Sequence, residues 1–268
     1  MPITFPYANQ VLLGDCLQIM PQWPEHSIDM VLCDLPYGTT QNTWDIPINL
    51  QELWAAYAKV VKPHGAILLF GQGIFTAKLI LSNQGIFRYK IVWIKSKATN
   101  FLNKAKQPLR KHEDICVFYL QQPTFNPQMG RGKIYKTKRN GSSQGTYGKY
   151  DAFTSESNGG RYPTDVLLYE PADFIYCQTC EHTLEDYFHH AQKPIELARY
   201  LIRMYSNPGD LILDNTCGSG SFLVAAAIEN RRYIGIELNQ IISRNGKEVN
   251  LIDTCRKRLS SLQSSLEL

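Results

Sequence analysis

The stretch LILDNTCGSGSFLVAA, residues 211–226, sets out a strand, a glycine-rich turn and a helix in immediate succession. An apolar run precedes the turn and an alanine-rich apolar run follows it, which predicts a buried strand and a helix packed on it. Gly218 and Gly220 let the backbone approach a ligand closely, and the helix N-terminus offers free N–H groups to a negative group. A turn with two glycines is often only a turn, so this feature alone leaves both interpretations open.

Glu237 strengthens the ligand interpretation. It ends the next apolar segment, RYIGIEL at 232–238, about twenty residues beyond the turn, the position from which an acid reaches the ribose of a nucleotide-type cofactor. In an ordinary dinucleotide fold this unit comes first, whereas here it comes last. The earlier strands must therefore complete the same sheet from the other side, as in a circular permutation.

Strand and helix patterns alternate along most of the chain. They predict an α/β fold with a mostly parallel, doubly wound sheet covered by helices on both faces. Strands are expected at 10–15, 27–34, 65–71, 89–95, 114–120, 210–215 and 232–238, and helices at 50–65, 194–209, 221–231 and the C-terminus. Residues 121–186 are rich in Gly, Ser, Asn, Tyr and Lys and weakly periodic, which indicates a functional loop or a separate lobe.

Length and composition fit one large domain, or a domain with one inserted lobe, in 268 residues. No window approaches about eighteen apolar residues, so no membrane span is predicted, and the N-terminus lacks a signal-peptide pattern. Seven cysteines at scattered spacings favour a reducing environment over a disulfide framework. We therefore expect a cytoplasmic protein.

Basic residues are unevenly spread, although the net charge is only +4. Residues 53–112 contain no Asp or Glu but 11 Lys and Arg, and residues 128–150 repeat the pattern with 6. A single lysine cluster can be merely solvating, but two long stretches of one sign favour a polyanionic partner.

A second distinctive stretch, CDLPYGTTQNTWD at 33–45, follows the apolar run SIDMVLCD. It places an acid, a proline and a tyrosine where a buried strand should end. Open α/β sheets bind ligands outside the carboxyl ends of their strands. We therefore expect residues 34–37 to lie near the same crevice as the glycine-rich turn.

With both stretches placed, the chain resembles the β class of amino-group DNA methyltransferases, which use S-adenosylmethionine. DLPY (34–37) is similar to their Asp-Pro-Pro-Tyr motif, LDNTCGSGSF to their cofactor loop and HHAQKP (189–194) to their His-Pro-x-Gln-Lys-Pro segment. GDCLQIMPQWPEHSIDMVLCD and RKHEDICVFY resemble two further segments, and the order of the motifs is that of the class. Leu35 and His190 stand where the class has prolines, and NTC stands where a Pro-Phe pair is common.

The resemblance implies a circularly permuted, Rossmann-like class I methyltransferase fold. The catalytic domain would comprise 1–120 and 187–268, with a target-recognition region inserted at 121–186. The implied reaction moves a methyl group to the exocyclic N6 amine of an adenine flipped out of double-stranded DNA. Cytosine N4 is the first alternative, followed by an RNA methyltransferase or an inactive nucleic-acid-binding module. The late glycine turn argues against a nicotinamide-dependent enzyme.

The resemblance also implies roles for individual residues. The Asp34 carboxylate and the Leu35 carbonyl would accept the two hydrogens of the target amine, Pro36 would hold the turn, and the base would stack on Tyr37. The implied cofactor residues are Asp15, Lys193, Asp214, Gly218, Gly220 and Glu237, with Lys193 at the methionine end. The expected DNA contacts are Trp44, Arg131, Lys133, Lys136, Lys138 and Arg139.

Several questions stay open at this level. The segment CQTCEH (177–182) has one CxxC pair, and a structural zinc site wants four ligands at set spacings, so no metal is expected. Relatives of this class include dimers, and the sequence does not decide whether this chain forms a homodimer. Neither the recognition sequence nor a link to restriction–modification can be read from the residues.

Overall fold

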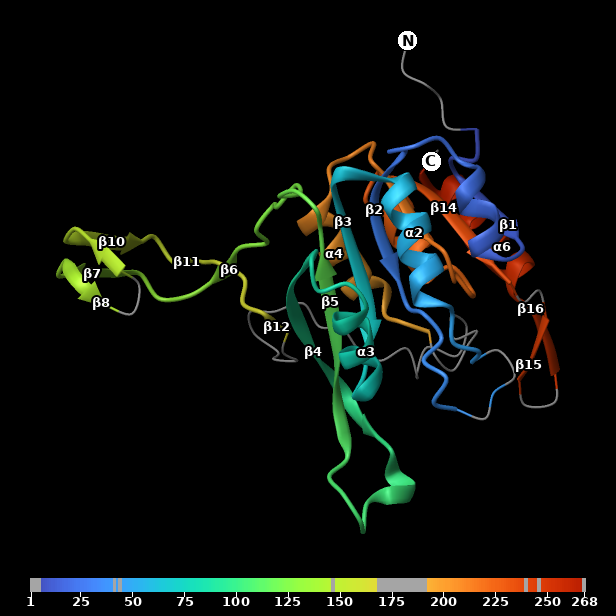
Figure 1. Ribbon diagram of the computed structural model, residues 1–268, viewed down its shortest axis with the longest axis horizontal. Coiled ribbons are helices and arrows are strands. Elements are labelled where there is room, and N and C mark those ends of the chain that lie inside the picture. Colours follow the sequence, from blue (N-terminus) through green and yellow to red (C-terminus); the bar gives the residue numbers. More distant parts are fainter. Residues whose placement is uncertain are drawn as a thin grey trace.

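The computed structural model describes residues 6–40, 42, 45–145, 148–167, 192–238, 241–244 and 247–266. Within them, the main sheet has eight strands in the order β1-β14-β13-β2-β3-β5-β4-β12 (Figure 1). The strands are β1 (Gln10–Leu13), β2 (Ile28–Cys33), β3 (Val61–Gly71), β4 (Phe87–Thr99), β5 (Arg110–Phe118), β12 (Val166–Leu167), β13 (Leu211–Asp214) and β14 (Arg232–Glu237). The expected α/β architecture with a mostly parallel sheet is confirmed.

The first and last thirds of the chain meet at the centre of this sheet. β13 lies between β14 and β2 and is parallel to both, with Ile212 opposite Met30 and Leu213 opposite Val31. β2 continues in parallel to β3, and β1 pairs in parallel with β14 at the edge. The late strand-turn-helix unit thus completes a sheet begun by the early strands, as the permuted order predicts.

One strand departs from the expected parallel arrangement. β5 runs antiparallel to both β3 and β4, with Glu113 opposite Trp93 in the β4 ladder. The connection from β4 to β5 is short and contains only the 3₁₀ turn η2 (Phe101–Asn103). A short connection joins antiparallel strands, whereas parallel neighbours need a longer crossover. The resulting hairpin projects beyond the sheet (Figure 1).

Helices cover both faces of the sheet. They are α1 (Cys16–Ile19), α2 (Leu50–Val60), α3 (Ile74–Ser82), α4 (Ile195–Tyr205), α5 (Ser221–Ile228) and α6 (Leu251–Leu266), with the 3₁₀ turn η1 (Met20–Gln22) after α1. β2 is buried on both sides: Met30 and Leu32 belong to one apolar cluster, and Val31 and Cys33 belong to the other. Among the described residues, no helix is both long and apolar enough to cross a membrane.

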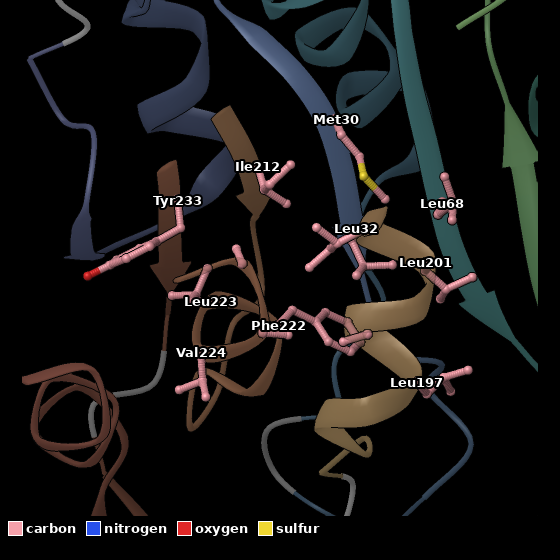
Figure 2. Close-up of a cluster of buried hydrophobic side chains, with 14 of the residues drawn as sticks. Met30, Leu32, Leu68, Leu197, Leu201, Ile212, Phe222, Leu223, Val224 and Tyr233 are labelled. Atoms are coloured by element: carbon pink, nitrogen blue, oxygen red, sulfur yellow. The ribbon is translucent and has the colours of Figure 1, made fainter. Parts of the chain in front are cut away.

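Figure 2 shows how α4 and α5 close one face of the sheet. Leu197 and Leu201 of α4 point toward the strands, and Phe222 of α5 extends toward α4. The Phe222 ring stacks on Phe70 of β3, with the ring centroids 5.4 Å apart. Burying a leucine or phenylalanine side chain contributes about 1.5–3 kcal/mol. This packing fixes the start of α5, and therefore the glycine turn before it, against β13.

The middle of the chain forms a separate antiparallel ribbon that projects from the sheet (Figure 1). Three nested pairs build it: β6 (Gly130–Arg131) with β11 (Gly160–Arg161), β7 (Tyr135–Arg139) with β10 (Phe153–Ser157), and β8 (Ser142–Gly145) with β9 (Gly148–Tyr150). A further hairpin, β15 (Ile241–Arg244) with β16 (Lys247–Asn250), precedes α6. The division at 121–186 stays a prediction, because 168–191 lie outside the described residues.

Candidate active site

A cavity of about 600 Å³ lies at the carboxyl ends of β2 and β13. The segment 34–37 lines it from the end of β2, and Asp214, Gly218 and Glu237 line it from the other side. Asp15 and Lys193 also contribute to the lining. The two stretches singled out in the sequence therefore share one crevice.

Asp34 has several polar contacts within the stretch 34–37 and beyond it. The Tyr37 hydroxyl donates to Asp34 Oδ1 at 2.8 Å, and Lys193 Nζ lies 2.5 Å from Asp34 Oδ2. The Tyr37 ring stacks on Phe75 of α3, with the ring centroids 4.7 Å apart. These contacts fix the carboxylate and the aromatic ring relative to each other at the cavity wall.

Lys193 joins the stretch 34–37 to β5 at the cavity wall. Its ammonium contacts Asp34 and lies 3.2 Å from Glu113 Oε2. It also lies 5.3 Å from the centre of the Phe70 ring. In this structure Lys193 thus contacts the stretch 34–37. The role that the resemblance implies for it, at the methionine end of a cofactor, stays a prediction.

Glu113 of β5 lines the cavity and was not singled out in the sequence. Its Oε1 lies 3.1 Å from Nζ of Lys95, which is itself buried. One signal could have found it: Glu113 is the first acid after the long acid-free stretch 53–112. An acid that ends such a stretch is a candidate partner for the lysines within it.

The charged groups of this cluster shift one another's pKa values. Burial raises the pKa of Asp34, an effect that Lys193 opposes and Glu113 reinforces. Burial would raise the pKa of Glu113 as well, but Lys193 and Lys95 lower it below its usual value. Burial would lower the pKa of Lys193, yet Asp34 and Glu113 raise it, so the ammonium stays charged.

The glycine turn is held by the acid that ends β14. The backbone N–H of Gly218 donates to Glu237 Oε2 at 2.8 Å, and the N–H of Gly14 donates to the Glu237 carbonyl. Gly218 has φ +52°, and no atom lies within 4 Å of a Cβ built there. Its backbone therefore faces open space in the cavity.

Gly220 and Asp15 have clear local roles. Gly220 has φ +81° and caps α5, and a Cβ there would overlap the sulfur of Cys255 in α6. Its contact is thus with a helix, and it does not line the cavity. Asp15 caps α1 by accepting from the Leu17 N–H at 2.8 Å. Their assignment to a cofactor stays a prediction.

Asp214 and Asp45 are buried acids whose pKa values are shifted in opposite directions. Burial raises the pKa of Asp214 to about 8, with a further contribution from Glu237. Burial would also raise the pKa of Asp45, but backbone hydrogen bonds from the loop 38–40 lower it. Those N–H groups donate to the Asp45 carboxylate at 2.7–2.9 Å and fold the loop after Tyr37 over one side of the cavity.

The expected DNA contacts lie on the projecting ribbon, away from the cavity. Lys136, Lys138 and Arg139 are on β7, which is exposed along its length. Lys136 forms an ion pair with Glu156 on β10. Arg131 of β6 and Lys133 are also exposed. Trp44 and the segment CQTCEH lie outside the described residues.

A model of a protein family described as DNA methylase matches residues 28–248. The matched range includes both stretches of the cavity. The chain is 25% identical over 250 residues to the type II methyltransferase M.HpaI of Haemophilus parainfluenzae, covering 90% of this chain and 73% of that protein. It is also 25% identical over 246 residues to the DNA adenine methyltransferase YhdJ of Escherichia coli strain K12, covering 87% and 79%.

Solved structures show the same fold at lower identity. The M1.HpyAVI–SAM complex superposes with a TM-score of 0.60 at 20% identity, over 93% of this chain and 98% of that one. The cytosine-N4-specific PvuII DNA methyltransferase gives a TM-score of 0.60 at 15% identity, over 96% of each.

The chain has the Rossmann-like class I fold of these structures. The chain belongs to the DNA methylase family.

Proposed function

We propose that this chain transfers a methyl group from S-adenosylmethionine to the N6 amine of an adenine extruded from double-stranded DNA. The observation that carries the proposal is the single cavity lined by both Asp34–Tyr37 and the Gly218–Glu237 pair. A base inside a duplex cannot reach such a cavity, so the target nucleotide has to leave the stack.

The cavity fits the cofactor on two counts. Its volume of about 600 Å³ is within the range of small-molecule sites. The bare backbone at Gly218 leaves space that any side chain would fill, and the Glu237 carboxylate lies beside it to meet hydroxyl groups. When bound, S-adenosylmethionine supplies an electrophilic methyl group on a sulfonium.

Asp34 and Leu35 make the target amine reactive. The lone pair of an exocyclic amine is delocalised into the ring, which makes it a poor nucleophile. Asp34 and the Leu35 carbonyl accept its two hydrogens and draw it toward tetrahedral geometry. The amine becomes acidic as it gains the methyl group, and Asp34, whose pKa is raised, is suited to take up the released proton. Positioning and electrostatics supply the rate enhancement.

We propose adenine as the target base because aspartate opens the motif DLPY (34–37). The relative YhdJ is also named as an adenine methyltransferase. The PvuII enzyme, which is cytosine-N4-specific, makes cytosine the alternative to test. The exposed cations of β6 and β7 are proposed to bind the phosphates of DNA, with the recognition region spanning 121–186.

The test is to incubate the full chain with radiolabelled S-adenosylmethionine and unmethylated DNA, then to separate the nucleosides. We expect label in N6-methyladenine. Label in N4-methylcytosine would replace the adenine assignment, and no label in DNA would overturn the proposal. Asp34→Ala should abolish transfer while cofactor binding, measured by calorimetry, is retained.

A further inference from the structure

Glu113 joins two buried lysines at the wall of the cavity. Its Oε1 lies 3.1 Å from Lys95 Nζ and its Oε2 lies 3.2 Å from Lys193 Nζ. Both lysine side chains are more than nine-tenths buried. A buried cation needs charged or hydrogen-bonding partners, and Glu113 supplies one carboxylate oxygen to each lysine.

Lys193 is shared unequally between two carboxylates. Its ammonium lies 2.5 Å from Asp34 Oδ2 but 3.2 Å from Glu113 Oε2. That Glu113 oxygen is buried without a completed hydrogen bond. Since a buried acceptor that lacks a full partner is costly, Glu113 Oε2 can receive the ammonium at closer range.

The target amine has to compete for Asp34. Tyr37 donates to Oδ1 of this carboxylate, and Lys193 occupies Oδ2. Tyr37 belongs to the same short turn and stacks on Phe75, which restrains it. Lys193 comes from a distant segment and has a second carboxylate beside it. Of the two donors, only Lys193 has an alternative carboxylate, Glu113, within reach.

We infer that Glu113 is a positioning residue for methyl transfer, which takes over the ammonium of Lys193 when the target amine binds to Asp34. This inference rests on the proposed function. The Lys193 ammonium binds the Asp34 carboxylate while no base is bound. It moves toward Glu113 on β5 when a base binds. Lys95 holds the other Glu113 oxygen and keeps the side chain facing the cavity.

Glu113→Gln tests the inference because the amide keeps an acceptor for Lys95 but removes the negative charge that attracts Lys193. The ammonium then stays on Asp34. We expect the single-turnover rate constant for transfer to fall by about tenfold or more, since a charged hydrogen bond has to be broken without a replacement. Cofactor affinity and the KM for DNA should change by less than about twofold, because Glu113 acts on the chemical step.

A double-mutant cycle shows whether Glu113 acts through Lys193. In the Lys193→Met background no ammonium covers Asp34, so Glu113→Gln should not slow transfer there. Multiplicative losses, or a Glu113→Gln rate equal to wild type, would overturn the inference. Glu196→Gln, a change at an exposed acid of α4 paired with Arg199, is the matched control and should leave the rate unchanged.

Two further results separate the possible failures. If the wild-type chain labels no DNA, the proposed function fails and this inference fails with it. If wild type labels DNA and the cycle is multiplicative, this inference alone fails. If Glu113→Gln does not fold, as judged by its cofactor affinity, Glu113→Asp takes its place in the cycle, since it keeps the charge but shortens its reach. The same non-additive result is expected.

Discussion

The hydroxyl of Thr216 donates a hydrogen bond to the backbone carbonyl of Asp34 across 3.0 Å, although the two residues are 182 positions apart in the chain. The same hydroxyl lies 3.0 Å from the sulfur of Cys33. Thr216 belongs to the turn after β13, and Asp34 follows β2. One side chain thus fastens the segment proposed to hold the base to the segment proposed to hold the cofactor.

Replacing Thr216 with valine should loosen this connection. Loss of one hydrogen bond should lower the free energy of unfolding by about 1 kcal/mol. Misplacement of Asp34 by a fraction of an ångström should lower the transfer rate by about tenfold. Thr216→Ser keeps the hydroxyl and serves as the control in the same kinetic and denaturation measurements. Equal rates for the two variants would show that the hydroxyl does not align the segments.

Alanine substitutions at Gly218 and Gly220 should affect different properties, cofactor affinity in one case and stability in the other. Gly220→Ala places a Cβ against the sulfur of Cys255 at a positive φ, so we expect a loss of about 2–4 kcal/mol in unfolding free energy. Gly218→Ala meets no protein atom, so its stability cost should be about 1 kcal/mol, with the main effect on cofactor affinity.

Denaturant unfolding and calorimetric cofactor binding separate these outcomes. Removing the sulfur with Cys255→Ala should recover part of the stability of Gly220→Ala and nothing of the affinity of Gly218→Ala. The distinction would be refuted if both glycine variants lost mainly stability.

Asp45 should stabilise the loop 38–40 in a pH-dependent way. Backbone N–H groups outweigh burial and hold the pKa of Asp45 below its unfolded value of about 4. The ionised carboxylate therefore stabilises the fold at neutral pH, and this is lost as pH falls through the folded-state pKa. Asp45→Asn should lower the unfolding free energy by about 1–3 kcal/mol at pH 7. Chemical denaturation from pH 7 to 3 should show this difference shrinking below about pH 4; a constant difference would contradict the account.

Asp214 should have the opposite dependence. Burial raises its pKa to about 8, so the folded protein holds a proton there that the unfolded chain releases above about pH 4. The unfolding free energy of the wild-type chain should therefore fall as pH rises from about 4 to 8, relative to Asp214→Asn. Thermal unfolding of both proteins across this range checks the prediction, and parallel curves would refute it.

The ribbon cations should set the salt dependence of DNA binding. Each phosphate contact contributes about 0.9 to the slope of log K against log salt. Replacing Lys136, Lys138 and Arg139 together with glutamine should therefore reduce the slope by about 2–3, with little effect on stability because all three are exposed. Glu156→Gln, which frees Lys136 from its ion pair, should not weaken binding. An unchanged slope in the triple variant would place the phosphate contacts elsewhere.

The convergence of the two stretches could be predicted because apolar runs locate strand ends and the order of the motifs fixes which strands are neighbours. Glu113 could not be found in this way. Its place opposite Trp93 depends on the register of the β4–β5 hairpin, which is set by the turn between them. The antiparallel direction of β5 has the same origin, since a strand's own pattern does not encode its direction.

Lys193 illustrates a second limit. The resemblance identifies it as functional, and the cavity includes it. Its partners, however, come from β5 and from the end of β2, which no local pattern links to residue 193. The burial of three charges in one cluster follows from packing, and only the folded chain displays it.

The most direct test of the central claim is a crystal structure of the chain with sinefungin, a non-reactive S-adenosylmethionine analogue, and a short DNA duplex. The account predicts the analogue against Gly218 and Glu237, and an extruded base beside Tyr37 with its amine on Asp34, both inside the same cavity. A base or an analogue bound outside that cavity, or a duplex with every base still stacked, would contradict it.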